Sequence, residues 1–216
     1  MIRIVPAAEP DTFAANVRNP GLCALAEMVG EKPRRLKGKR FQKIADRREN
    51  IPFDKFPPYW TEALDDLMTA YSQICAYSCF KIHRVTGGRS VDHMIAKSKA
   101  WDKVYEWSNY RLSCTRLNAR KNNFEAVLDP FEIQDDWFQL ELVGFQVVPN
   151  PNLDNAIRTA VENTIERLGL NDFCRDRAER AEDYWAVDVT LKILTAESPF
   201  VTRELRRQGR LLPEDK

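Results

Sequence analysis

The amino-acid sequence predicts an α+β fold, in which a small β-hairpin and the helix that follows it are embedded in a mainly helical single domain. Two observations predict this class. Within residues 89–123, two short apolar stretches with strand character flank a long loop, and the second runs directly into a helical pattern. Over residues 157–168, apolar residues recur at helical spacing. A chain of 216 residues is long enough to bury one hydrophobic core.

The composition is that of an ordinary globular protein, with 44% hydrophobic and 30% charged residues. No apolar run approaches the roughly 18 residues that a membrane span requires, and residues 1–6 are too short for a signal peptide. We therefore expect a cytoplasmic protein that does not enter a membrane. The five cysteines are odd in number and scattered, which argues against a secreted disulfide framework.

The net charge of +1 averages segments of opposite sign. Residues 32–48 hold nine lysines and arginines against one aspartate, and residues 81–123 hold ten against three acids. Residues 124–163 hold eight acids and one arginine. The two basic segments indicate a surface for a polyanion such as nucleic acid, although charge runs also occur as solvated faces.

The N-terminal segment, residues 1–58, is expected to contain little regular structure. Prolines favour an extended course for residues 1–20, and a short helix then ends near Gly30. The basic stretch 31–50 contains a proline and a glycine and is expected to form a loop or arm. After three more prolines, the next segment, residues 59–149, opens with a helix for which Thr61 is the predicted N-cap, and one apolar stripe predicts this helix: Leu64, Leu67, Met68, Tyr71 and Cys75.

The central segment, residues 59–149, holds the predicted hairpin and helix. Gly87-Gly88 marks a turn, followed by a strand over Arg89–Ile95. A loop over 96–108 leads to a second strand over Tyr110–Cys114, and a helix begins near Thr115. A second hairpin is expected from the alternating patterns at 137–142 and 145–148, which flank Gly144.

The C-terminal segment, residues 150–216, is expected to be helical. The stripe that ends at Leu168 predicts a helix stopped by Gly169. Another helical stretch begins near Asn171 and runs past Trp185, and Ser198-Pro199 opens a last, arginine-rich segment.

Polar residues with the chemistry of a metal-dependent phosphodiesterase follow one another through the predicted strand, loop, strand and helix. Asp92 is a natural ligand for a hard cation such as Mg²⁺ or Mn²⁺, and the amide oxygen of Asn118 is a plausible second ligand. Asn122 lies one turn further along the helix and is either a third ligand or a cap. The side chains of neighbouring residues on a strand point to opposite faces, so one of Asp92 and His93 can face the metal while the other faces the water.

The remaining site residues are expected to assist hydrolysis or hold the substrate. His93 is the candidate general base that deprotonates water, and Asn109 is expected to bridge the long loop and orient His93 through a hydrogen bond. Four cations are candidates for contacts to phosphates: Lys97, Arg116, Arg120 and Lys121. Taken singly these signals are weak, because a lone histidine is often structural and an asparagine before a strand often serves a turn.

The ordered set Asp92-His93, Asn109 and Cys114-x-x-x-Asn118-x-x-Lys121 resembles the ββα-metal core of the HNH endonuclease superfamily. The resemblance covers residues 89–123. It implies that His93 is the base, that Asp92 and Asn118 bind metal, and that Asn109 supports the site without taking part in the chemistry.

A narrower resemblance rests on Cys75-Ala76-Tyr77, on residues 105–109 and on residues 165–171. These short segments are similar to segments of the compact HNH proteins found beside an ATPase in bacterial anti-phage systems, the PtuB component of Septu and its retron-associated relatives. The resemblance implies an antiviral role and a partner, a PtuA-like ATPase of the SMC or ABC type, whose state controls the nuclease.

The chain departs from the family in one respect. Many HNH proteins hold a structural zinc between two Cys-x-x-Cys pairs, whereas here Ser78 and Leu117 stand at the second position of each pair. We therefore expect no structural zinc, although an irregular set is conceivable from Cys75, Cys79, Cys114 and His83.

The expected function is that of a metal-dependent DNA endonuclease. Its sequence specificity is expected to be low, because no recognition helix is evident. Two alternatives stay open. The same chemistry serves an RNase acting on tRNA or other structured RNA, because attack by water needs no 2′-hydroxyl. A catalytically silent interaction module is the other.

Overall fold

The computed structural model describes residues 1–32 and 40–215. Residues 33–39, which form part of the predicted basic arm, lie outside the described residues. The predicted α+β class is confirmed, since the described residues form seven α-helices and two small antiparallel sheets of two strands each.

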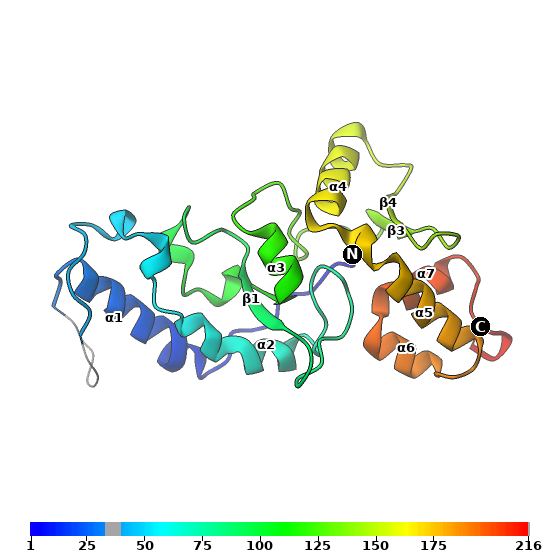
Figure 1. Ribbon diagram of the computed structural model, residues 1–216, viewed down its shortest axis with the longest axis horizontal. Helices are drawn as coiled ribbons and strands as arrows, with labels where there is room; N and C mark the ends of the chain where they lie inside the picture. Colours follow the sequence, from blue (N-terminus) through cyan, green and yellow to red (C-terminus); the bar gives the residue numbers. More distant parts are fainter. Residues whose placement is uncertain (33–39, 216) are drawn as a thin grey trace.

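The elements are spread along one long axis (Figure 1), with α1 near one end, the first sheet and α3 in the middle, and α5 to α7 at the other end. The strands are β1 (Arg89–His93), β2 (Tyr110–Cys114), β3 (Phe138–Leu140) and β4 (Val147–Pro149). The helices are α1 (Asn19–Met28), α2 (Leu64–Ala70), α3 (Thr115–Lys121), α4 (Asn155–Leu168), α5 (Cys174–Trp185), α6 (Leu191–Glu197) and α7 (Pro199–Arg207).

The central unit is a hairpin followed at once by a helix. β1 and β2 are antiparallel, with His93 opposite Tyr110 and Arg89 opposite Cys114. β2 and the start of α3 lie where the sequence predicts them, whereas β1 ends at His93, two residues before the predicted end. Because α3 follows β2 without a loop, it folds back against β1 and brings its polar side chains to the strand that carries Asp92 and His93.

The N-terminal segment packs on this unit through aromatic rings. The Phe13 ring meets Trp107 and Tyr110 edge-on, with centroids 5.6 and 5.7 Å apart. The expectation of an extended course over residues 1–20 is wrong for residues 14–20, because a π-helical segment, Ala14–Arg18, leads directly into α1. Pro20 lies in the first turn of α1, where its missing N–H is tolerated.

Helix α2 is shorter than predicted at both ends. A 3₁₀ turn over Tyr59–Ala63 precedes it, so Thr61 is not its N-cap and its hydroxyl donates instead to the Pro58 carbonyl at 2.7 Å. The helix ends at Ala70 because the chain reverses through two residues with positive φ, Ser72 (51°) and Gln73 (65°). The predicted stripe is otherwise correct, since Leu67 is fully buried.

The second hairpin, at the end of the central segment, is present as predicted, and the C-terminal segment after it is helical. β3 and β4 are antiparallel, and the Asp154 side chain caps α4 by accepting from the Ile157 N–H at 2.9 Å. Gly169 ends α4 with a φ of 60°, a left-handed conformation that favours glycine. In the described part of the chain, no helix combines the length and apolar character needed to cross a bilayer.

Candidate active site

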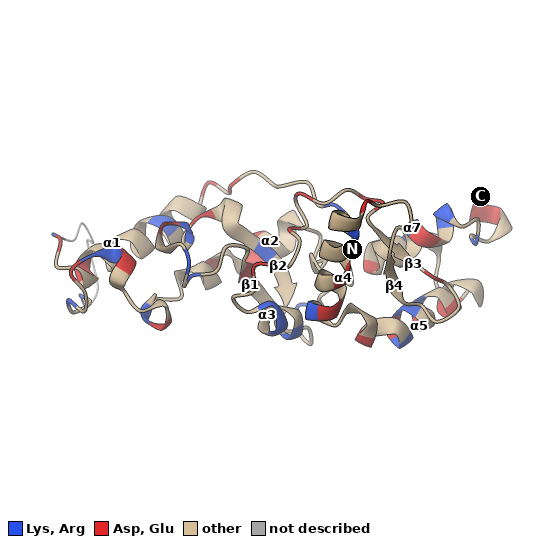
Figure 2. Ribbon diagram, turned by 90° about the horizontal axis from the view of Figure 1, so that it is seen from above, with Lys and Arg blue, Asp and Glu red and all other residues tan. Residues whose placement is uncertain are grey.

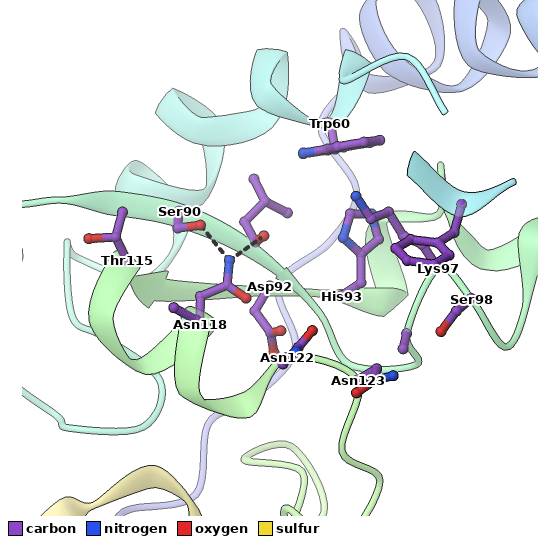
Figure 3. Close-up of a pocket in the computed structure, with 14 residues that line it drawn as sticks. Trp60, Ser90, Asp92, His93, Lys97, Ser98, Thr115, Asn118, Asn122 and Asn123 are labelled. Atoms are coloured by element: carbon purple, nitrogen blue, oxygen red, sulfur yellow. Dashed lines mark hydrogen bonds between the residues drawn. The ribbon is translucent and has the colours of Figure 1, made fainter. Parts of the chain in front are cut away.

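A pocket of about 430 Å³ lies where β1, α3 and the loop after β1 meet. It brings together five of the residues singled out from the sequence: Asp92, His93, Lys97, Asn118 and Asn122 (Figure 3). The other residues that line it are Phe53, Trp60, Ser90, Val91, Ala96, Ser98, Thr115, Ala119 and Asn123. The predicted convergence of β1 and α3 is therefore present, and Asp92 is the sole acidic residue among the described residues that line the pocket.

Asp92 is almost completely buried, with 2% of its surface exposed. One carboxylate oxygen, Oδ1, lies 3.1 Å from the Lys121 ammonium, and Oδ2 accepts a hydrogen bond from the Tyr77 hydroxyl. Burial raises the pKa of the Asp92 carboxyl, and the Lys121 charge and the Tyr77 hydrogen bond oppose that shift. The carboxylate is thus held in place from two sides.

Lys121 does not face solvent, as a phosphate contact would require. Its side chain is fully buried, and besides Asp92 its ammonium donates to the carbonyl oxygens of His93 (2.9 Å) and Met94 (3.2 Å). The sequence prediction for Lys121 is corrected accordingly: the residue fastens the end of β1 to α3. The sequence did not predict this inward orientation, because a basic residue in the last turn of a helix is usually exposed to solvent.

His93 has a fixed orientation. Its Nε2 lies 3.0 Å from the Val104 carbonyl oxygen, which also accepts from the Tyr110 hydroxyl at 2.8 Å. Since a carbonyl oxygen only accepts, Nε2 carries the proton and Nδ1 is left with its lone pair. The ring packs edge-on against Trp60 and Tyr110, with centroids 5.0 and 5.1 Å apart.

The protonation state of His93 follows from its surroundings. The side chain is buried, and burial together with the charges of Lys97 and Lys121 lowers the pKa of the imidazole to about 3, against the opposing effect of the Val104 hydrogen bond. The imidazole is therefore neutral at physiological pH, which a proton acceptor requires. The same burial makes it a weaker base than a solvated imidazole.

Asn109 bridges the loop as predicted, but it does not hydrogen-bond the imidazole of His93. Its Oδ1 accepts from the Ile95 N–H at 2.7 Å, and its Nδ2 donates to the carbonyls of Ile95 and Lys103, each at 3.0 Å. The expectation that Asn109 orients His93 directly is therefore corrected. Asn109 closes the two ends of the loop, and the Val104 carbonyl within that loop holds the imidazole.

Asn118 is oriented by β1. Its Nδ2 donates to Ser90 Oγ at 2.5 Å and to the Val91 carbonyl at 3.1 Å (Figure 3). In the described part of the chain the amide oxygen Oδ1 has no hydrogen bond, so it is available to a ligand. Asn122 ends α3 with a φ of 49°, and its N–H donates to the Asn118 carbonyl, so the cap role is confirmed while its exposed side chain lines the pocket.

The three remaining cations have different partners. Lys97 lines the pocket with its ammonium 4.1 Å from the centroid of the Trp60 ring, and it forms no ion pair with a described carboxylate. Arg116 and Arg120 both pair with Asp172, and Arg120 also donates to the carbonyl of Leu168 at 2.9 Å. The two arginines of α3, a helix with blue segments in Figure 2, therefore tie α3 to the corner between α4 and α5.

The donor set of the pocket fits a hard divalent cation. Asp92 and Asn118 offer oxygens from neighbouring elements, and oxygens are the ligands that Mg²⁺ and Mn²⁺ prefer. Each Asp92 oxygen keeps one lone pair after its contact with Lys121 or Tyr77. No three His, Cys, Asp or Glu side chains converge among the described residues, so the candidate ligands here are one carboxylate and amide oxygens.

Sequence reasoning missed the residues that hold the site from behind. Tyr77 binds the Asp92 carboxylate, Trp60 packs on His93, and Val104 supplies only a main-chain carbonyl. Tyr77 lies in the phrase Cys75-Ala76-Tyr77, which the sequence did single out, but without any role at Asp92. Because every residue has a main-chain carbonyl, the residue type at position 104 does not indicate that this carbonyl holds His93.

The cysteines considered for zinc lie apart from this pocket. The Cys75 sulfur accepts from the Cys114 N–H at 3.4 Å, and the two thiols line a second pocket together with His83. Cys79 is buried and does not line that pocket. All five cysteines are free thiols.

Comparison with models of known protein families and with curated protein sequences found no match to this chain.

Proposed function

We propose that this chain is a metal-dependent HNH endonuclease that hydrolyses phosphodiester bonds of nucleic acid. The observation that supports it best is that Asp92, His93 and Asn118 line one pocket formed by an antiparallel hairpin and the helix after it. Asp92 and Asn118 would hold Mg²⁺ or Mn²⁺. When bound, such a cation supplies a Lewis acid that stabilises the charge developing on the phosphate.

The protein's own groups supply the rest of the chemistry. The lone pair on Nδ1 of His93 accepts a proton from the attacking water, and the Val104 carbonyl stabilises the imidazolium that forms. The ammonium of Lys97 attracts the phosphate, since no described carboxylate neutralises it. These contacts involve no base edges, which supports cleavage with little sequence specificity.

A second candidate function is favoured by two observations at the same site. Both oxygens of Asp92 are already hydrogen-bonded, and His93 is only 7% exposed. A catalytically silent module that binds nucleic acid or a protein would have these features. Metal binding separates the two candidates, because a nuclease needs Asp92 and Asn118 as ligands and a silent module does not.

The test is cleavage of supercoiled plasmid by the purified full chain with Mg²⁺ or Mn²⁺, with EDTA as the metal-free control. We expect nicking that is lost in His93→Ala and kept in Lys192→Ala, an exposed cation on α6. Calorimetric titration of Mn²⁺ into Asn118→Ala should show at least tenfold weaker binding than to wild type. Cleavage that survives in His93→Ala would refute the proposed base.

The substrate and partner belong to the same proposal. We favour DNA as the polymer and, from the resemblance to PtuB-type nucleases, a PtuA-like ATPase that restrains cutting. Running the assay in parallel on tRNA, with and without the ATPase, distinguishes a DNase, an RNase and a nuclease that is active only in its complex. No cleavage under any condition, with no Mn²⁺ binding, favours the silent module.

A further inference from the structure

Two thiols face each other at the junction of β2 and α3. Cys114 is the residue from which α3 begins, and its main-chain N–H donates to the Cys75 sulfur at 3.4 Å. The Cys75 turn is fastened alongside β2 because the Ala76 N–H donates to the Leu112 carbonyl at 2.8 Å. The pair is thus held together by main-chain contacts on both sides.

Each thiol lies among hydrogen-bond donors. The Cys75 sulfur accepts from the Cys114 N–H and interacts with the Cys114 thiol and with Ser78, and the Cys114 sulfur lies near the main chain of Arg116 and Leu117 at the start of α3. Burial alone would raise the pKa of the Cys75 thiol, but the interactions with Cys114 and Ser78 outweigh it and lower the pKa. The contact with Cys75 raises the pKa of Cys114, so Cys75 is the more acidic thiol of the pair.

The second pocket, which has a volume of about 290 Å³, adjoins the pair; Cys114 is partly exposed, whereas Cys75 is 1% exposed. Cys75 and Cys114 both line it, together with His83 and five charged residues: Lys81, Asp176, Glu179, Arg180 and Glu197. The other cysteines lack this combination. Burial raises the pKa of Cys79 and Cys174, and Cys23 lies on α1 and does not line this pocket.

We propose that Cys75 and Cys114 are a redox-active dithiol that a hydroperoxide converts to a reversible disulfide. The Cys75 thiolate attacks the peroxide, its O–O bond breaks, and a sulfenic acid and an alcohol or water are formed. The Cys114 sulfur then attacks the sulfenic sulfur, the S–S bond forms and water leaves. In sum, two thiols are oxidised and one peroxide is reduced.

The bond would join two segments that both reach Asp92. Cys75 lies two residues before Tyr77, which donates to the carboxylate, and Cys114 opens the helix that carries Lys121. Oxidation therefore cross-links the supports of the candidate site without involving its ligands. The proposal does not rest on nuclease activity.

The experiment treats the reduced full chain with increasing hydrogen peroxide, alkylates the remaining thiols and maps peptides by mass spectrometry without reduction. We expect one cross-linked pair, Cys75 with Cys114, which dithiothreitol reverses, while Cys23, Cys79 and Cys174 are still alkylated. In Cys114→Ser, dimedone should label Cys75. Cys79→Ser, which leaves the pair intact, should form the cross-link as readily as wild type.

Three results would overturn the proposal. One is oxidation of Cys23 or Cys174 at lower peroxide than is needed for the pair. Another is a cross-link that joins a different pair of cysteines. The third is an equivalent of metal, bound in the protein as purified, that protects Cys75 and Cys114 from alkylation. All three are measured on the wild-type chain, so none depends on a variant that folds, and none requires cleavage activity.

Discussion

The ammonium of Lys121 lies 3.1 Å from the Asp92 carboxylate, and neither side chain has meaningful contact with solvent. This pair joins the last residue but one of β1 to the last residue of α3. A buried ion pair contributes little net stability compared with apolar residues of the same shape, but the loss of one partner leaves the other charge without compensation. The site is therefore sensitive to which partner is removed.

Lys121→Met is expected to destabilise the fold by about 3–5 kcal/mol, because it leaves the Asp92 carboxylate buried without its cation. Urea unfolding measures the change. The double variant Lys121→Met/Asp92→Asn removes both charges and should recover part of the loss. If Lys121→Met unfolds at the wild-type urea concentration but binds DNA more weakly, Lys121 serves phosphate and not the fold.

The buried imidazole of His93 predicts a pH dependence of stability. Its pKa is about 3 in the folded protein and about 6.5 in the unfolded chain, so between these values only the unfolded chain binds the proton. The free energy of unfolding should therefore fall as the pH drops from 6.5 toward 3, by at most about 1.4 kcal/mol per pH unit. Urea unfolding in EDTA at several pH values tests this.

The matched control for that series uses the other histidine of the chain. His93→Asn should flatten the fall in stability with acid, whereas His83→Asn, at an exposed position, should keep the wild-type slope. Equal slopes for the wild type and His93→Asn would show that the imidazole does not lose its proton on folding.

Asn109 is expected to tolerate aspartate less well than alanine. Asn109→Ala leaves the Ile95 N–H and two carbonyls without a partner, at a cost of about 1–3 kcal/mol for each group that water cannot reach. Asn109→Asp also points a carboxylate at the carbonyls of Ile95 and Lys103. Thermal unfolding measures the order, with the exposed Asn123→Ala as control, and the reverse order would mean that Asn109 is not a donor to these carbonyls.

Lys97→Ala is expected to weaken the binding of nucleic acids by the same factor whatever their base sequence. If its ammonium contacts one phosphate, the slope of log affinity against log salt should become smaller by about 1. Fluorescence anisotropy with labelled DNA at several salt concentrations measures this. Lys99→Ala serves as control, because Lys99 pairs with Glu125 and does not line the pocket, and equal slopes for both variants would remove Lys97 from the interface.

The elements that were predicted well from the sequence are those bounded by residues that end helices or form turns. Gly169 ends α4, and the polar turn around Gly144 separates β3 from β4. The errors arose where a distant contact or a backbone reversal decides the outcome. Pro20 favoured an extended chain but is accommodated in the first turn of α1, and α2 ends before Cys75 because Ser72 reverses the chain.

The candidate site shows the same division. Asp92, His93 and Asn118 were identifiable because each has a side chain suited to the expected chemistry and they follow one another in order. The inward turn of Lys121 was not identifiable, because a lysine at the end of a helix looks the same in the sequence whether it is solvated or buried. Its position depends on carbonyls of β1 that only the folded chain brings near.

The acceptor that fixes the proton of the His93 imidazole belongs to the main chain of Val104. Every amino acid has that carbonyl, so a substitution at position 104 that preserves the course of the loop also preserves the tautomer. The path of the backbone at Val104 therefore determines which nitrogen of His93 carries the proton. Insertions or deletions between Ile95 and Asn109 should therefore change it more than exchanges of side chains at position 104.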